Sequence, residues 1–520
     1  MAHFRCIHWV FVVSLLPVVS AGCDKKDKAA ASVSPPANSA KEVAPQPPLL
    51  TDADVASAVM AELRRDPGVD AGELHAHASD GVVELTGRAH DILTRKRAVR
   101  VAEAVKGVRA VSDRIELALP TRADGDIARD VRDALLTDST TDSYAVSSKV
   151  DGGKVTLTGS VASYQEQQMA ERVVEGVRGV RSVQNDITVK LGVERADAAV
   201  AADVRSCLRW DALVNDGLIG VEVHDGRVAL TGQVASATEK RRAALDSWVL
   251  GVKEVDPAGL KVTWYAQDRE LMKNKLLGKA DSDIAAAVRA AAAYDPRVSA
   301  ADLHADVSAG VVTLSGSVGT LSGKLAAEDI ARHTVGVTSV KNALAVKPVK
   351  PVSDATIQKS VEAALFWNPY TSPYAIHVKA HDGQVTLTGS TETPYERAQA
   401  TNVAANIHGV KDINNDIAVT RGELTYVYSP YLFPYAPYWP SWAYIPSVST
   451  ESDPEIAREI HEELLWSPFV DADQVKVSVE HGKATLTGQV DSVGERMAAT
   501  DNAFEGGATV VENDLTVKGG

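Results

Sequence analysis

The chain has 520 residues, too many for a single hydrophobic core, so several domains are expected. Acidic residues outnumber basic ones by 69 to 54, and the net charge of −15 argues against nucleic-acid binding and against broad attraction to an anionic membrane surface. Any lipid binding must therefore be local.

The first residues have the layout of a secretory signal peptide, in which Arg5 precedes an apolar run and small residues precede Cys23. The Ser-Ala-Gly-Cys tetrad at 20–23 resembles a bacterial lipobox, although the usual Leu three residues before the cysteine is absent. We predict a signal peptide at 1–22 and lipidation of Cys23; a plain export signal and an uncleaved membrane anchor are the alternatives. Asp24 resembles an inner-membrane retention signal, so the expected location is the periplasm or cell envelope, with the inner membrane favoured.

Residues 23–49 are rich in Lys, Ala, Ser and Pro and have no apolar period, which predicts a disordered tether. Beyond this point Cys207 is the only cysteine, so we expect no disulfide.

A seven-residue motif, Gly-x-Val-x-Leu-Thr-Gly, then recurs six times with minor variation. Its alternating apolar and polar residues predict a half-buried strand. Turn-forming residues before the first glycine, as in Asp382-Gly383, predict that this strand is the second arm of a hairpin. A third glycine, about twenty residues later, is predicted to end a helix. The motif glycines are Gly81, Gly87, Gly107, Gly153, Gly159, Gly179, Gly226, Gly232, Gly251, Gly310, Gly316, Gly336, Gly383, Gly389, Gly409, Gly482, Gly488 and Gly507.

Another helical pattern precedes each hairpin, with Asp before it as the expected N-cap. A short strand such as Ile187–Val189 follows the last glycine, often after an Asn-Asp turn. The repeat is therefore predicted to be α-β-β-α-β, about seventy residues long.

The repeat resembles the BON domain, the bacterial OsmY-type module, whose hallmark is Asp-Gly-x-Val-x-Leu-x-Gly, a helix, and then Gly-Val-x-x-Val-x-Asn. Residues 382–389 and 409–415 carry both parts. The resemblance implies an α+β fold of six tandem modules, each a small three-stranded mixed sheet with two helices packed on one face. It also implies an envelope protein without catalysis that binds phospholipid or other envelope partners. The third and sixth copies depart from the motif at 255–258, at Ala484 and at 506–508, and are expected to differ in use rather than in fold.

The repeats divide the chain into modules with short connectors. The predicted boundaries are module 1 at 50–119, module 2 at 122–191, module 3 at 195–264, a linker helix at 265–279, module 4 at 280–348, module 5 at 352–420, a Pro- and aromatic-rich linker at 421–450, and module 6 at 452–519.

The last linker carries an uncharged, aromatic stretch at 426–446 whose prolines exclude a regular helix or a membrane span. Two interpretations stay open. The stretch is either an interfacial anchor or docking segment, or a loop that packs across modules 5 and 6. Its candidate contact residues are Tyr431, Phe433, Tyr438, Trp439 and Trp442.

Aromatic residues also lie at the end of the first helix in several modules, at Trp210, Phe366, Trp367 and Trp466. If exposed, they are candidate membrane or partner contacts. The favoured interpretation is that they cap a small core.

The basic clusters Arg95–Arg97 and Lys240–Arg242 are also candidates for local lipid contact, although solvated helix faces are the favoured interpretation. No phosphate-binding loop, Gly-x-Ser-x-Gly or His-Glu-x-x-His motif occurs. The pairs His75/His77 and His377/His381 each share a strand face, but neither pair recurs. We therefore expect no enzyme activity, no metal and no cofactor.

Two functions stay open. The favoured one is an envelope-anchored adaptor that binds membrane phospholipid or an envelope assembly. The alternative is a periplasmic stabiliser or chaperone-like holdase active in osmotic or envelope stress.

Overall fold

The computed structural model describes residues 50–66, 68–141, 144–190, 195–263, 275, 278–298, 302–371, 374–392, 394–420, 452–467, 469–508 and 510–518. These residues all belong to one unit that begins at Leu49. The predicted signal peptide, Cys23, the tether up to residue 49 and the aromatic linker at 421–450 lie outside the described residues. So does most of the predicted linker helix, of which Lys275 is described and helical.

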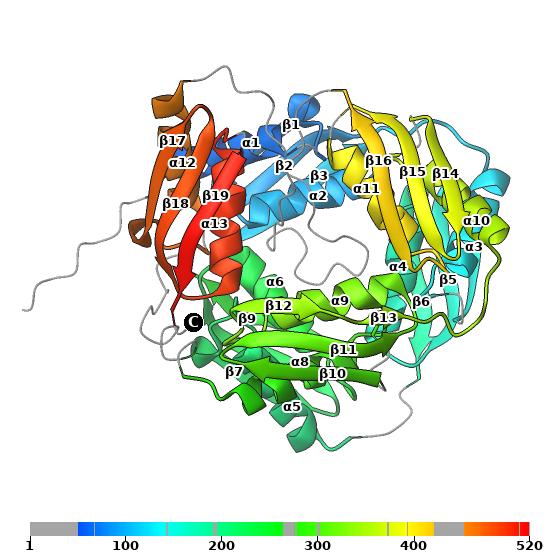
Figure 1. Cartoon of the computed structure of the whole chain (residues 1–520), viewed down its shortest axis with the longest axis horizontal. Helices are drawn as coiled ribbons and strands as arrows, with labels where there is room; N and C mark the ends of the chain where they lie inside the picture. The colour runs from blue at the N-terminus through cyan, green and yellow to red at the C-terminus, as the bar shows by residue number, and fades with distance from the viewer. Residues whose placement is uncertain are drawn as a thin grey trace, which may run out of the picture. The chain divides into compact units, whose positions relative to one another are not determined.

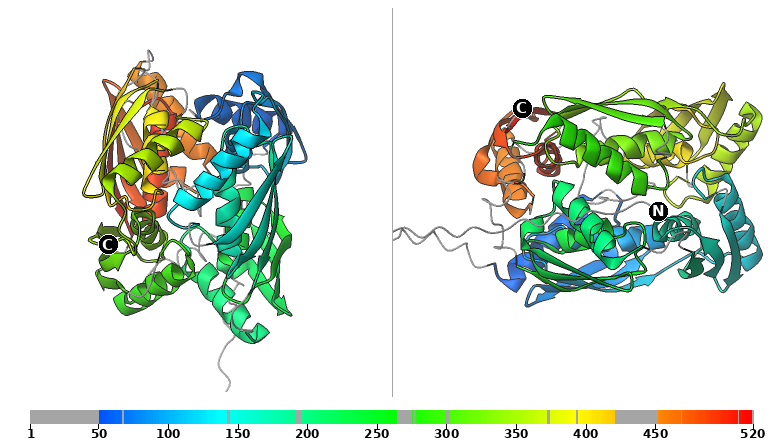
Figure 2. Two further views of the ribbon diagram at one scale, coloured as in Figure 1. Left: turned by 90° about the vertical axis from the view of Figure 1, so that its right-hand side faces the viewer. Right: turned by 90° about the horizontal axis from the view of Figure 1, so that it is seen from below.

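Each repeat folds as α-β-β-α-β around one sheet (Figure 1). The motif strand is central; it pairs antiparallel with the first strand and parallel with the third. The two helices lie on the same face of their sheet, as the further views also show (Figure 2). The prediction of six α+β modules with mixed sheets is confirmed.

The elements of modules 1 to 3 follow one order. In module 1 they are α1 Asp52–Arg65, η1 Ala71–Glu73, β1 Leu74–Ser79, β2 Val82–Ala89, α2 Ile92–Glu103 and β3 Ala110–Leu117. In module 2 they are α3 Asp124–Thr137, β4 Ala145–Asp151, β5 Lys154–Val161, α4 Tyr164–Glu175 and β6 Ser182–Val189. In module 3 they are α5 Asp197–Trp210, η2 Asp216–Leu218, β7 Ile219–His224, β8 Arg227–Val234, α6 Ala237–Asp246 and β9 Glu254–Val262.

Modules 4 to 6 repeat this order, with the third strand of module 4 split in two. In module 4 the elements are α8 Asp281–Tyr294, β10 Leu303–Ser308, β11 Val311–Val318, α9 Leu321–Arg332, β12 Ser339–Asn342 and β13 Ala345–Val346. In module 5 they are α10 Asp354–Trp367, β14 Ile376–His381, β15 Gln384–Thr391, α11 Pro394–Ala405 and β16 Asp412–Val419. In module 6 they are α12 Asp453–Trp466, η4 Ala472–Gln474, β17 Val475–Glu480, β18 Lys483–Val490, α13 Val493–Glu505 and β19 Val510–Val517.

The two glycines of the heptad are required for different reasons. The first has φ between 70° and 80°, and the residue before it has φ between 50° and 58°, which makes the hairpin a type I′ turn. At the second, an added Cβ would lie 1.8–2.3 Å from the carbonyl oxygen of a residue at the start of the first strand or just before it. The motif strand therefore pairs with its neighbours only when this residue is glycine.

The aspartate at the start of each first helix has a role that differs from the predicted one. It is the first helical residue rather than the N-cap, which is Thr51 in module 1 and Ala123 in module 2. Its carboxylate accepts hydrogen bonds of 2.8–3.0 Å from both turn amides of the following hairpin in every module. These bonds lower the pKa of Asp52, Asp197 and Asp354. The residue therefore clamps the hairpin turn to the first helix.

The third strand is longer than predicted, and the motif asparagine lies inside it. Asn185 donates from Nδ2 to the carbonyl of Gln167 and to the carboxylate of Glu171, both at 3.0 Å. The expected Asn-Asp turn is thus a strand segment tied to the second helix. Module 3 has Asp256 and Pro257 at this place, and its strand pair shifts register there, but its three strands remain.

Modules 1, 3, 4 and 6 each have a core of their own, whereas modules 2 and 5 share one. The buried residues of modules 2 and 5 form one continuous cluster, which includes Val131, Val174, Val361 and Ile407. Within the described part of the chain, no helix combines the length and apolar character needed to span a membrane.

Candidate functional site

In three pairs of modules, the end of the first helix of one module contacts the residue before the third motif glycine of the other. Its last carbonyl accepts a hydrogen bond from the amide that precedes the third motif glycine of the other module. The contacts are Val335 to Trp210 at 2.9 Å, Arg178 to Trp367 at 2.8 Å, Lys106 to Trp466 at 3.3 Å, and His408 to Thr137 at 3.0 Å. Module 3 thus contacts module 4, modules 2 and 5 contact each other in both directions, and module 6 contacts module 1.

A short antiparallel bridge extends two of these contacts. Asp211 bridges Thr334, and the Ala212 amide donates to the His333 carbonyl at 2.9 Å. Asp138 bridges Ile407 in the same way. Because backbone groups form these bonds, the contact tolerates different side chains at equivalent positions.

A polar residue directly after the first helix forms the same turn in all six modules. Its side chain accepts a hydrogen bond from the amide two residues later, which makes an Asx-type turn. The acceptors are Asp66, Asp138, Asp211, Asp295, Asn368 and Ser467, at 2.7–3.4 Å. The sequence analysis missed these residues, although an Asp, Asn or Ser recurs at the same spacing from the first helix.

The predicted aromatic residues of the helix ends lie in different surroundings. Trp367 is buried, while Trp210 packs against the core of module 4 and Trp466 against the core of module 1. Phe366 is 58% exposed, and the guanidinium of Arg178 lies 5.0 Å from its ring centroid.

The position of Phe366, one residue before the helix end, is apolar and exposed in two more modules. Leu136 is 60% exposed and Leu465 is 49% exposed. The ammonium group of Lys106 donates to the carbonyl of Leu465 at 2.8 Å. Two of these helix ends therefore present an apolar side chain beside a cation from another module. We call Leu136, Phe366 and Leu465 the helix-end apolar residues.

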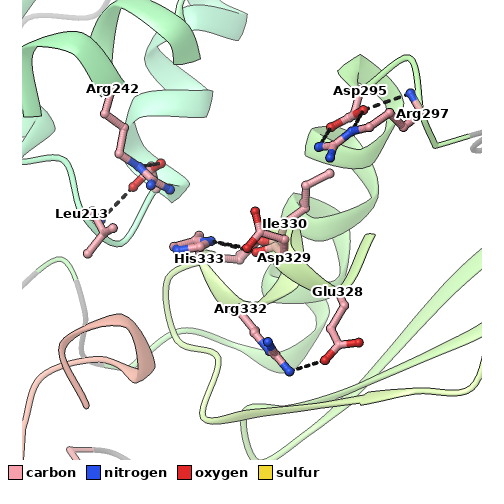
Figure 3. A network of polar contacts seen from close by, with 11 residues as sticks. Leu213, Arg242, Asp295, Arg297, Glu328, Asp329, Ile330, Arg332 and His333 are labelled. Carbon is pink, nitrogen blue, oxygen red and sulfur yellow. Dashed lines mark hydrogen bonds and ion pairs between the residues drawn. The ribbon is translucent and has the colours of Figure 1, made fainter. Parts of the chain in front are cut away.

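The contact between modules 3 and 4 carries a buried polar network (Figure 3). Nε of Arg242 lies 2.5 Å from the carboxylate of Asp211, and both side chains are almost fully buried. The same carboxylate accepts from the Leu213 amide at 2.7 Å. Across the contact, burial lowers the pKa of His333, so its ring is neutral, and Nδ1 lies 2.9 Å from the Asp329 carbonyl.

A cavity of about 200 Å³ adjoins this network, between residues of modules 2, 3 and 4. Its lining includes Cys207, Trp210, Trp248 and His333. Burial raises the pKa of the Cys207 thiol, which keeps this thiol protonated and unreactive. The cavity is smaller than the roughly 300–1,000 Å³ of typical small-molecule sites. We therefore assign it no ligand.

The basic clusters are only partly the solvated helix faces that the sequence suggested, since the side chain of Lys96 is 43% exposed while other members are buried. Arg97 is buried and lies 2.5 Å from Asp66, in the same arrangement as Arg242 and Asp211. Lys96 pairs with Glu175 of module 2. Opposite charges within the chain bind these cations, which makes them poor candidates for lipid headgroups.

The paired histidines lie on exposed strand surfaces. His75, His77, His377 and His381 are all exposed. His381 lies 3.7 Å from the carboxylate of its neighbour Asp382.

The geometry of the six modules agrees with a comparison against known families. The model of the BON domain matches residues 51–118, 123–190, 196–263, 280–348, 353–421 and 452–519, which together make up most of the chain. The chain belongs to the BON-domain family. A curated BON relative, the osmotically-inducible protein Y of Escherichia coli (strain K12), is 29% identical over 143 residues, which are 26% of this chain and 71% of that protein.

Two solved structures of CdsD, described as a structural protein of the type III secretion system of Chlamydia trachomatis, are also similar. The C-terminal domain structure is 14% identical, covers 42% of this chain and 90% of its own, and has a TM-score of 0.11. The second is 12% identical, covers 44% and 100%, and has a TM-score of 0.12. At such TM-scores they carry no argument about how the BON modules are arranged or what they bind.

Proposed function

We propose that this BON-domain protein is a non-catalytic adaptor of the bacterial envelope whose modules contact phospholipid locally. The observation that carries the proposal is the exposure of the helix-end apolar residues, two of which lie beside a cation. Phe366 lies beside Arg178, and Leu465 lies beside Lys106. An apolar side chain can enter the acyl boundary of a bilayer while the adjacent cation meets a phosphate. The net charge of −15 confines this attraction to such spots.

Vesicle co-sedimentation tests the proposal, with residues 24–520 and liposomes of either phosphatidylglycerol or phosphatidylcholine. Transfer of one Phe or Leu side chain from water is worth about 1.5–3 kcal/mol, or roughly tenfold or more in Kd. The double variant Phe366→Ser/Leu465→Ser should therefore lose most of the binding to phosphatidylglycerol vesicles.

Val349→Ser is the matched control, because Val349 is an 86% exposed apolar residue in a connector, away from the helix ends. This control should pellet like the parent chain. If the double variant pellets as well as the parent, or if the parent pellets with neither lipid, the helix ends do not bind phospholipid.

The proposal includes an N-terminal lipid anchor at Cys23, supported by the lipobox-like tetrad. Metabolic labelling with a radioactive fatty acid should label the full-length chain in a bacterial host and should not label Cys23→Ser. Equal labelling of both chains would exclude this anchor.

A second candidate function is a stress-linked stabiliser of other envelope proteins, which the similarity to an osmotically-inducible protein favours. Suppression of aggregation of a heat-denatured client protein tests it. Phe366→Ser/Leu465→Ser should reduce this stabilising activity only partly, because a stabiliser would bind its clients through a diffuse apolar surface. The same variant should abolish specific lipid binding. A chain that leaves client aggregation unchanged at equimolar concentration would rule this candidate out.

A further inference from the structure

Three glutamates meet where module 6 contacts module 1. Glu62 lies on α1, Glu463 on α12 and Glu505 at the end of α13. One carboxylate oxygen from each lies within 4.8 Å of the others. The side chain of Glu463 is 4% exposed and that of Glu62 is 19% exposed. The three negative charges are thus largely removed from water.

A fourth carboxylate lies beside this cluster. Asp501 is one turn before Glu505 on α13, is fully buried, and neither of its carboxylate oxygens has a hydrogen-bond partner. Burial and repulsion by Glu505 raise the pKa of Asp501 well above its usual value. Burial and the neighbouring glutamates likewise raise the pKa of Glu62. Arg65 contacts Glu62 and Glu463, so one guanidinium serves the carboxylates of this cluster.

The equivalent positions in the other modules show that the fold does not need these charges. Glu62 and Glu463 both occupy the eleventh residue of the first helix, where the other modules have Ala134, Cys207, Ala291 and Ala364. The other four modules therefore form the same fold with a small apolar residue at the eleventh position of the first helix. Ionised glutamates at this place repel one another, and the single charge of Arg65 cannot balance all three of them.

We propose that a calcium ion binds between Glu62, Glu463 and Glu505 and joins module 1 to module 6. Calcium takes oxygen ligands at about 2.3–2.6 Å, so two oxygens on one ion can be up to about 5.2 Å apart, which accommodates the observed separation. Magnesium demands near-ideal octahedral geometry and usually keeps several waters, so a site built from three protein carboxylates suits calcium better. Asp501, buried next to Glu505 and without a hydrogen-bond partner, adds a further acidic group beside this ion.

Calcium titration into residues 24–520 tests this site, with isothermal calorimetry and thermal unfolding as readouts. Calcium should bind, should raise the unfolding midpoint above that in EDTA, and should bind at least tenfold more tightly than magnesium. Terbium, which replaces calcium, should luminesce on excitation of tryptophan, because Trp466 lies one turn from Glu463.

The variant Glu62→Ala/Glu463→Ala copies the residues of the pair formed by modules 2 and 5, so it should fold and lose the response to calcium. Glu505→Gln should weaken calcium binding at least tenfold, and it provides a second variant should the first not fold. Glu462→Gln is the matched control, since it removes an exposed charge from the same helix.

An unfolding midpoint that is equal in calcium and EDTA would overturn the proposal. So would a calcium response that persists in Glu62→Ala/Glu463→Ala. A midpoint that rises on acidification in EDTA, with no effect of calcium, would show that protons rather than a cation neutralise the cluster.

Discussion

Gly389 shows why the second motif glycine of a module cannot carry a Cβ atom. Its φ is 129°, and an added Cβ would lie 2.3 Å from the carbonyl oxygen of Ala375, just before β14. Neither the backbone angle nor the space suits any other residue.

Gly389→Ala should therefore destabilise module 5 by about 1–3 kcal/mol or more, through strain and loss of pairing between β14 and β15. Hydrogen exchange of the β14 and β15 amides should become faster by the corresponding factor. Gly125→Ala is the control, because no atom lies within 4 Å of its added Cβ and it stands in the first turn of α3. That change should be neutral or stabilise by up to about 1 kcal/mol. Unchanged exchange in Gly389→Ala would contradict this account.

The buried pair of Asp211 and Arg242 gives a second expectation for single residues. Arg242→Met leaves the Asp211 carboxylate buried without its charge partner, which should cost about 3–5 kcal/mol. The double change Asp211→Asn/Arg242→Met should cost less stability than Arg242→Met alone. Module 5 has the uncharged residues Asn368 and Gln399 at the equivalent positions and keeps the same turn. Comparison of the two chains by hydrogen exchange in α5 and α6 checks this. A double variant as unstable as the single one would contradict the unpaired charge as the cause.

At the scale of elements, the clamp between the first helix and the hairpin turn depends on pH. Bonds from the turn amides lower the pKa of Asp197 in the folded chain. Its contribution to stability is therefore present above the unfolded pKa of about 3.9 and is lost as the pH falls through the lower folded value.

Asp197→Asn should lower the unfolding midpoint at pH 7, and this difference should begin to shrink as the pH falls below about 3.9, the unfolded pKa. Thermal unfolding followed by circular dichroism between pH 7 and pH 3 measures it. Glu222→Gln, an exposed change on β7 of the same module, should show no such dependence. A deficit in Asp197→Asn that stays constant with pH would show that the charge of the clamp is unimportant.

At the scale of the whole molecule, the helix-end contacts join module 1 with 6, module 2 with 5 and module 3 with 4. Chain segments far apart in sequence therefore hold each other through helix-end contacts and, for modules 2 and 5, a continuous core. The connectors are therefore not needed to hold the paired modules together.

A protease site inserted after Lys350, in the connector where Val349 is 86% exposed, should be cut without separating the fragments. Residues 24–350 and 351–520 should elute together in size-exclusion chromatography, because modules 5 and 6 contact modules 2 and 1. Two peaks of the separate fragments would show that these contacts do not hold the chain together.

The repeat was predictable because its signals are local. Hairpin glycines, alternating strands and helical stripes each depend on residues a few positions apart, and six copies made the pattern unmistakable. The roles of Asp52 and Asn185 were harder to predict, because the groups they bind lie on other elements of the module.

The sequence by itself determined the fold and number of the modules, since backbone geometry and apolar periodicity act within each repeat. Only the tertiary structure decided which modules meet, because the helix-end contacts use backbone groups that leave no trace in the side chains. It also decided that Phe366 is exposed while Trp367 is buried. The cluster of Glu62, Glu463 and Glu505 is the clearest case: its members come from opposite ends of the chain, and no spacing rule connects them.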